Sequence, residues 1–385
     1  MNLASRFFYS PHCSKYSFKS SEFKNILGNV ILVNDIDLDH KKFNEQVRNF
    51  ECDESLTISN CMFLKIRGNT QNGAVRMGSC DCKFGGNFSC ENSVFSQCTG
   101  IDFGGLMIYA SNAKIKNTCF MKCLGILGNQ AFHVSCDRFE VESVTVFSSP
   151  CNLKEAYNFS TSFANCKLNC KYFNSSYNMG YYRHSKNYAE PHGMIAMFKN
   201  LQESNIAYFF VNANTGRNGF YFVNCNSTTY IEQSQFCNST YSSALFEPYN
   251  SNNHVIILEN VSFWDLNSSN YAIKEKMKFN IIGNVYAYGK KPGSSVKTII
   301  GKTIDYISKE TIKIGENEMF NFTIEQNKNC YQPPETITEP PKKHSTKTIA
   351  ITISLSFIGI VIILIILFIV NQIRNNKLTK WIQFS

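Results

Sequence analysis

The sequence predicts an all-β fold, a parallel β-helix that is followed by a single C-terminal transmembrane α-helix. Three observations predict it: short β-type segments recur about every 27 residues, Ile349 to Val370 form one uncharged apolar run, and all 16 cysteines precede that run. With 14% aromatic residues, 32 of them Phe, the 385-residue chain has enough large apolar side chains to form a core.

The repeat consists of two apolar residues separated by one position, with a bulky apolar residue five positions later. Leu56, Ile58 and Phe63 form the first clear copy. Alternation over five residues is typical of a β-strand, and the 3.6-residue spacing of a helix is absent. Clear copies occupy residues 56–63, 88–95, 113–120, 139–146, 166–173, 229–236 and 256–263, and weaker ones begin near residues 199 and 279.

A second segment follows most copies, in which a small or polar residue runs into an apolar cluster. These segments are residues 73–75, 104–109, 130–134, 193–198, 219–223 and 244–246. Two or three short strands cannot bury their inner face alone, so we expect successive repeats to stack and each strand to pair with its copies above and below. Inward Phe and Ile would then form continuous columns. Residues 56–329 are therefore predicted to form a β-helix ectodomain.

Residues 1–55 match the repeat poorly, and we predict an N-terminal cap with irregular first coils. Asp35, Asp37 and Asp39 would place three carboxylates on one strand face, which we interpret as a solvated face of this cap. Met1 to Tyr9 contain no apolar run long enough for a secretory signal.

The C-terminal part is predicted to contain a stalk, a membrane span and a tail. Residues 330–347 hold four prolines, which favours an extended Pro-rich stalk. Residues 348–371 are predicted to form the transmembrane helix, because the 22 residues from Ile349 to Val370 measure roughly 33 Å as a helix and a hydrocarbon core is about 30 Å thick. Residues 372–385 would form a short cytoplasmic tail.

Two orientations of this span remain open. Lysine residues lie on both sides of it, so the positive-inside rule gives no clear answer. The chain is either a type I protein at the plasma membrane with an atypical or missing leader, or a tail-anchored protein with its N-terminal domain in the cytosol. The cysteine usage favours the first arrangement, at the cell surface.

The cysteines fall at equivalent positions of the repeat. Phe95 to Cys98 and Phe120 to Cys123 share the pattern F-x-x-C in neighbouring coils. Stacked Cα atoms about 4.8 Å apart fall within the disulfide range of roughly 4.4–6.8 Å. Parallel Cβ vectors make the torsion angle of such a bridge hard to satisfy. A Cys98–Cys123 disulfide and an unbonded thiol stack are both open.

Eight glycosylation sequons occur in the chain. Chance predicts nearly as many from the content of Asn, Ser and Thr, so they permit a glycosylated ectodomain without arguing for one. The sequon asparagines are Asn87, Asn158, Asn174, Asn226, Asn238, Asn260, Asn267 and Asn321.

The motifs resemble those of a known group of surface proteins. F-x-x-C at Phe95 to Cys98, F-x-x-N at Phe84 to Asn87 and the turn Gly104-Gly105-Leu106 are similar to polymorphic outer membrane protein repeats, over roughly residues 56–290. They also resemble the single-span, Cys-rich β-helix surface proteins of parasitic protists. The resemblance implies a pectin-lyase-like, right-handed parallel β-helix and a surface interaction role such as adhesion.

The same fold raises the question of polysaccharide cleavage. Lyases need clustered carboxylates for Ca²⁺ and a basic residue, and hydrolases need two carboxylates that face the scissile bond. Asp81, Asp102, Asp137 and Asp265 share no repeat position, so we expect no acidic ladder across adjacent coils. The motifs G-x-S-x-G, H-E-x-x-H and the P-loop are also absent. We therefore predict no catalytic, cofactor or metal site.

These observations together predict a non-catalytic, single-pass membrane surface protein. Its rigid, glycosylated β-helix would serve adhesion or other extracellular recognition, with a host-cell or extracellular glycan or protein as ligand. The alternative is a membrane-tethered polysaccharide lyase or hydrolase of the pectin-lyase-like fold. The net charge of +9 includes no basic run with interleaved aromatic residues, so nucleic acid is not an expected partner.

Overall fold

The computed structural model of the chain is built from β-strands. It describes residues 8–10, 15–33, 55–68, 73–78, 86–101, 103–125, 129–149, 159–179, 193–251, 253–264, 266–268, 271–273, 278–288 and 312–314. These residues belong to the first of two compact units, residues 1–330. All regular elements within them are strands, so the prediction of an all-β fold is confirmed for this part of the chain.

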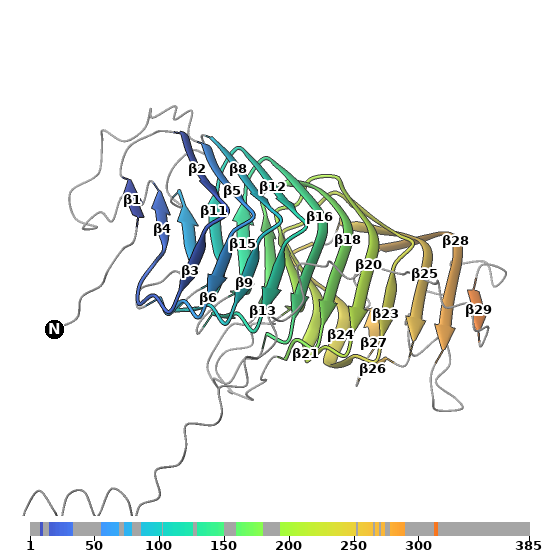
Figure 1. The fold of residues 1–385 in the computed structure, drawn as a ribbon. Coiled ribbons are helices and arrows are strands. Elements are labelled where there is room, and N and C mark those ends of the chain that lie inside the picture. The colour runs from blue at the N-terminus through green and yellow to red at the C-terminus, as the bar shows by residue number, and fades with distance from the viewer. Residues whose placement is uncertain are drawn as a thin grey trace, which may run out of the picture. The chain divides into compact units, whose positions relative to one another are not determined.

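The strands pair in parallel throughout the described residues, most of them with their equivalents one repeat earlier and one repeat later. Ile115, for example, lies opposite Cys90 on one side and Val141 on the other. Figure 1 shows the resulting stack of strands. The predicted stacking is confirmed, and the fold is a parallel β-solenoid.

Two long sheets run along the solenoid. Sheet A contains, in order of pairing, β1 (Phe8–Ser10), β4 (Ile31–Val33), β7 (Val75–Met77), β11 (Leu106–Tyr109), β15 (Asn129–Ser135), β17 (Phe159–Ala164), β19 (Gly193–Lys199), β21 (Thr215–Val223), β24 (Thr240–Tyr249) and β26 (Asn267–Ser268), with β27 (Tyr271–Ile273) also paired to β24. The small-then-apolar segments of the sequence lie in or directly before strands of sheet A, as the repeat predicted.

Sheet B holds the alternating segments. Its main path is β2 (Lys15–Lys19), β5 (Ser55–Ser59), β8 (Asn87–Glu91), β12 (Asn112–Lys116), β16 (Arg138–Phe147), β18 (Lys167–Ser176), β20 (Ser204–Asn212), β22 (Thr228–Glu232), β25 (Val255–Trp264), β28 (Lys278–Tyr288) and β29 (Ile312–Ile314). A second row of short strands joins it: β3 (Glu22–Lys24), β6 (Met62–Leu64), β9 (Val94–Ser96), β13 (Cys119–Met121) and β23 (Gln235–Cys237). The strands β10 (Thr99–Gly100) and β14 (Leu124–Gly125) pair separately.

The spacing of the repeat follows from a corner between two strands. Leu56 and Ile58 point into the core from β5, Asn60 turns the chain with a φ of 55°, and Phe63 points into the core from β6. Asparagine tolerates this left-handed conformation better than most residues, which explains why it recurs at this corner. In β16, β18, β20, β25 and β28 the same turn lies within one longer strand.

Aromatic rings form a continuous column inside the solenoid, as the sequence predicted. Phe23, Phe63, Phe95 and Phe120 stack with successive centroid distances of 5.0, 4.5 and 4.9 Å. Phe23 belongs to a coil within residues 1–55, where β2 and β3 pair with β5 and β6. The first regular coil therefore begins well before Leu56.

Glycine is required where sheet A strands begin next to one another. A Cβ atom on Gly73, before β7, would lie 1.9 Å from the carbonyl oxygen of Gly104. One coil further on, a Cβ atom on Gly105 would lie 2.4 Å from the carbonyl oxygen of Ala131. Only a residue without a side chain allows the backbones to approach this closely.

The described cysteines are mostly structural thiols. Nine are buried and free: Cys61, Cys90, Cys98, Cys123, Cys136, Cys166, Cys170, Cys225 and Cys237. Cys119 is disulfide-bonded.

Cys98 and Cys123 stack in adjacent coils without a bridge, so the structure contains the unbonded form of this pair. The Cys98 thiol lies 3.3 Å from the carbonyl oxygen of Phe63, and the Cys123 thiol lies 3.5 Å from that of Phe95. Burial, together with the contact to Cys123, raises the pKa of Cys98 well above its ordinary value. The Cys98 thiol therefore acts as a neutral packing group.

The predicted membrane segment is not part of this description. Within the described residues, no helix has the length and apolar character needed to cross a bilayer. The stalk (330–347), the predicted transmembrane helix (348–371, with Ile349 and Val370) and the tail (372–385) lie outside the described residues.

Candidate functional site

The outer face of sheet B carries columns of charged side chains. Because alternate residues of a strand point outward, residues in register form columns along the stack. One column reads Glu91, Lys116, Glu142 and Lys171 in β8, β12, β16 and β18. Charges of opposite sign thus lie one strand apart along this part of the face.

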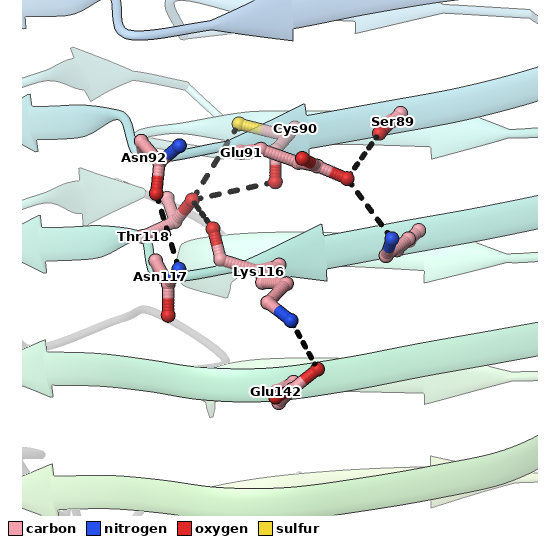
Figure 2. Close-up of polar contacts among 9 residues, drawn as sticks. Ser89, Cys90, Glu91, Asn92, Lys116, Asn117, Thr118 and Glu142 are labelled. Carbon is pink, nitrogen blue, oxygen red and sulfur yellow. Dashed lines mark hydrogen bonds and ion pairs between the residues drawn. The ribbon is translucent and has the colours of Figure 1, made fainter.

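Ion pairs join charged side chains of neighbouring strands on this face (Figure 2). Lys116 Nζ lies 2.9 Å from Glu142 Oε2. Lys114 Nζ lies 3.0 Å from Glu91 Oε1, and this contact raises the pKa of Lys114 above its ordinary value. Half-exposed pairs of this kind contribute at most about 1 kcal/mol each to stability. Their main effect is that the chain neutralises its own charge here.

Asparagine side chains form a second ladder beside the ion pairs. Asn117 Nδ2 donates to Asn92 Oδ1 at 3.1 Å, across the corner of adjacent coils (Figure 2). Asn112 Nδ2 donates to Asn87 Oδ1 at 2.9 Å in the same pair of strands. The polar groups on this half of the face are therefore largely satisfied by one another.

The alternation of opposite charges along this column ends at β20. The column that contains Lys171 continues with Ala207, Glu232 and Glu259 in β20, β22 and β25. Two glutamates thus lie directly opposite each other, an arrangement that destabilises a sheet. Within the described residues neither of them forms an ion pair.

These glutamates line a cavity of about 280 Å³, which we name the acidic groove. Its wall contains carboxylates from three successive coils together with aromatic and aliphatic side chains. The lining residues are Glu203, Asn205, Tyr230, Ile231, Glu232, Ile257 and Glu259. Tyr230 and Ile257 lie opposite each other in register, two residues before Glu232 and Glu259.

A pair of tyrosines occupies the corner at the start of this region. Tyr172 and Tyr208 stack with a centroid distance of 4.8 Å and an interplanar angle of 16°. Their φ angles are 55° and 54°, a left-handed conformation that is strained for a bulky residue. Tyr208 directly follows Ala207, which pairs with Glu232, so the aromatic corner adjoins the acidic groove.

A partly buried His–Ser contact lies on sheet A. His133 Nδ1 is 2.9 Å from Ser162 Oγ, and the imidazole ring packs against Phe103 and Tyr109. Burial, and secondarily Lys199, lowers the pKa of His133 to about 4. Ser162 is completely buried, so we interpret the pair as a packing contact.

The described sequon asparagines differ in exposure. Asn87, Asn226 and Asn238 are exposed, whereas Asn174 and Asn260 are half-buried. Asn238 donates to Asn212 Oδ1 at 3.0 Å, and Asn260 Oδ1 accepts from the backbone N–H of Asn284 at 3.3 Å. Asn267 lies in β26, and Asn158 and Asn321 lie outside the described residues.

The acidic groove was missed by the sequence analysis, which considered aspartates only. Of the four aspartates that the sequence offered as a possible acidic ladder, Asp137 is exposed before β16. The other three, Asp81, Asp102 and Asp265, lie outside the described residues. Glu232 and Glu259 are 27 residues apart, which is the typical repeat length. That spacing was the available signal for adjacent acidic positions in successive coils.

Comparison of the chain with protein-family models, curated proteins and solved structures found no match.

Proposed function

We propose that the chain is a single-pass membrane surface protein whose solenoid offers an extracellular recognition surface for adhesion. Residues 56–329 would form a right-handed, pectin-lyase-like β-helix of the kind found in the protist surface proteins that the repeats resemble. Residues 348–371 would cross the plasma membrane in a type I orientation. The uncharged run of 22 residues supports the membrane span, and the parallel solenoid supports a rigid ectodomain.

The acidic groove is the observation that carries the proposal. It interrupts a face on which Lys114 and Lys116 pair with glutamates of neighbouring strands. Keeping like charges in register lowers stability, and a ligand of opposite charge removes that cost when it binds. A rigid sheet holds such a surface in place, so less conformational entropy is lost on binding.

An adhesion assay tests this function. We expect cells that display the full chain to adhere to host cells or coated matrix, and the double variant Glu232→Gln/Glu259→Gln to lose most of that adhesion. The control Glu22→Gln/Glu140→Gln, which changes two exposed glutamates elsewhere, should adhere normally. No adhesion by the wild-type chain, or equal adhesion by both variants, would contradict the proposal.

Topology needs its own measurement. Protease treatment of intact cells should digest the solenoid, and glycosidase treatment should change its mobility on a gel. A chain that is protected from protease and unshifted by glycosidase would instead favour the tail-anchored arrangement with a cytosolic solenoid.

One observation also favours a second candidate, a membrane-tethered polysaccharide hydrolase or lyase. Glu232 and Glu259 line the same groove, and hydrolases use two carboxylates that face the scissile bond. We expect no depolymerisation of uronate polysaccharides by the full chain, with or without calcium. Product formation that Glu232→Gln abolishes would overturn the non-catalytic proposal.

A further inference from the structure

We propose that the acidic groove is a docking site for an arginine-bearing segment of a partner protein. The inference rests on the proposed recognition function and adds the chemistry of the partner. The partner is expected to be a cationic polypeptide, because the groove combines unneutralised carboxylates with an aromatic ring and an aliphatic side chain.

The paired carboxylates match the shape of a guanidinium group. Glu232 and Glu259 are register partners on adjacent strands, which lie about 4.8 Å apart. A guanidinium presents several N–H donors in a planar fork, so one arginine can donate to both carboxylates at once. An ammonium group is a compact point charge and lacks this geometry.

The remaining wall suits the rest of an arginine side chain. Tyr230 and Ile257 form the neighbouring register pair on the same face, and both are half-buried. The tyrosine ring can take a cation against its face, and the isoleucine can cover the methylene stem. A small hydrated cation would gain nothing from these two residues.

The other half of the face shows what the groove lacks. There, Glu91 and Glu142 are each paired with a lysine of the neighbouring strand β12. In the groove, the corresponding columns of β20 hold Asn205 and Ala207. The complementary charge must therefore come from outside the described residues, and charge complementarity selects a basic partner.

The spread of the charges favours a polypeptide over a single ion. Glu203, Glu232 and Glu259 come from three successive coils and therefore extend over roughly 10 Å along the stack. In the described part of the chain no three Asp, Glu, His or Cys side chains converge as metal ligands do. Glu203 lies four positions before Ala207, the residue opposite Glu232, so a segment that reaches all three carboxylates needs more than one basic side chain.

Direct binding to the full chain in lipid nanodiscs tests the inference. The probe is a fluorescent octapeptide of alternating Arg and Ser, compared with the same peptide in which citrulline or Lys replaces Arg. We expect the Arg peptide to bind best, the citrulline peptide to fail, and added salt to weaken binding. Glu232→Gln/Glu259→Gln should weaken binding at least about tenfold, and Tyr230→Ala by about threefold.

The control variant Glu22→Gln/Glu140→Gln makes the same change in net charge and should bind like the wild type. Circular dichroism on every variant separates loss of the site from loss of the fold. Equal binding of the citrulline peptide, an unaffected groove variant, or saturation of the groove by Ca²⁺ alone would overturn the inference. Peptide binding without cell adhesion would contradict the proposed function but support this site. Adhesion without peptide binding would contradict this site but support the proposed function.

Discussion

A cysteine at a corner of the solenoid makes the same contacts as a serine. Cys225 Sγ lies 3.5 Å from the carbonyl oxygens of both Phe198 and Val223. One coil further on, Ser251 Oγ donates to the carbonyl oxygens of Phe222 and Tyr249 at 3.2 and 3.0 Å. The high cysteine content therefore reflects a repeated demand for small, weakly polar groups inside the turns.

This equivalence predicts a mild effect of Cys98→Ser. The hydroxyl should keep the contact to the carbonyl oxygen of Phe63, and the free energy of unfolding should change by less than about 1 kcal/mol. Cys98→Leu should cost about 1–3 kcal/mol, because the buried site has no room for a larger side chain. Denaturant unfolding of the full chain in detergent measures both. A loss of more than about 2 kcal/mol for the serine variant would indicate that Cys98 is bridged.

A half-buried histidine makes stability depend on pH. Burial lowers the pKa of His133 from 6.5 to about 4, so the folded chain holds the ring neutral where the unfolded chain would protonate it. The stabilisation is complete above about pH 6.5 and is lost as the pH falls toward 4, by up to about 3 kcal/mol. Unfolding at pH 7 and pH 4.5 should show a steeper loss in the wild type than in His133→Gln. Equal losses of unfolding free energy in the two proteins would contradict the claim that folding keeps the His133 ring neutral.

At the scale of elements, asparagine holds the corners together in two environments. Buried Asn214 accepts from the backbone N–H of Asn178 at 2.8 Å and donates to the carbonyl oxygen of Ser175 at 2.8 Å. Exposed Asn200 donates to Asn165 Oδ1 at 2.8 Å in a similar ladder. These hydrogen bonds have the same length, but water can replace a lost partner only at the exposed position.

Because Asn214 is buried and Asn200 is exposed, we expect substitutions at the two positions to lower the free energy of unfolding by different amounts. Asn214→Leu should lower the free energy of unfolding by about 2–4 kcal/mol, because it leaves a buried N–H and a buried carbonyl unpaired. Asn200→Leu should cost less than about 1 kcal/mol, because water replaces the lost partner. Thermal or denaturant unfolding of both variants measures the difference. Similar costs at the two positions would show that the buried ladder does not stabilise the corners.

Inward positions were predictable from the sequence because hydrophobic side chains alternate along each strand. Leu56, Ile58 and Phe63 are all completely buried, and their spacing includes the corner at Asn60. Tyr16, Phe18 and Phe23 have the same spacing but lie in the segment that the sequence predicts as a cap with irregular first coils. Their flanking lysines and short strands hid the pattern. The outward columns leave no hydrophobic signal, so the acidic groove left only the 27-residue spacing of Glu232 and Glu259 in the sequence, and the register then placed these two residues opposite each other.

At the scale of the whole molecule, every functional proposal depends on the register of the stack. Ser55, Asn87, Asn112, Arg138 and Lys167 occupy one column. The registers of β20 with β18 and β22 align this column with a second one, which contains Thr228, Val255 and Lys278. In this register, a side chain on one coil lies about 4.8 Å from the equivalent side chain on the next coil. Charge pairing on one half of sheet B and the acidic groove on the other both follow from that spacing.

Pulsed electron paramagnetic resonance distances between spin labels measure the register most directly. With one label on Ser55 and the second on Lys167, Thr228 or Lys278, the labels are four, six and eight strands apart along sheet B. We expect distances that increase with each step, to about 19, 29 and 38 Å. Distances that do not grow with the number of strands between the labels would contradict the stacked solenoid and the recognition surface inferred from it.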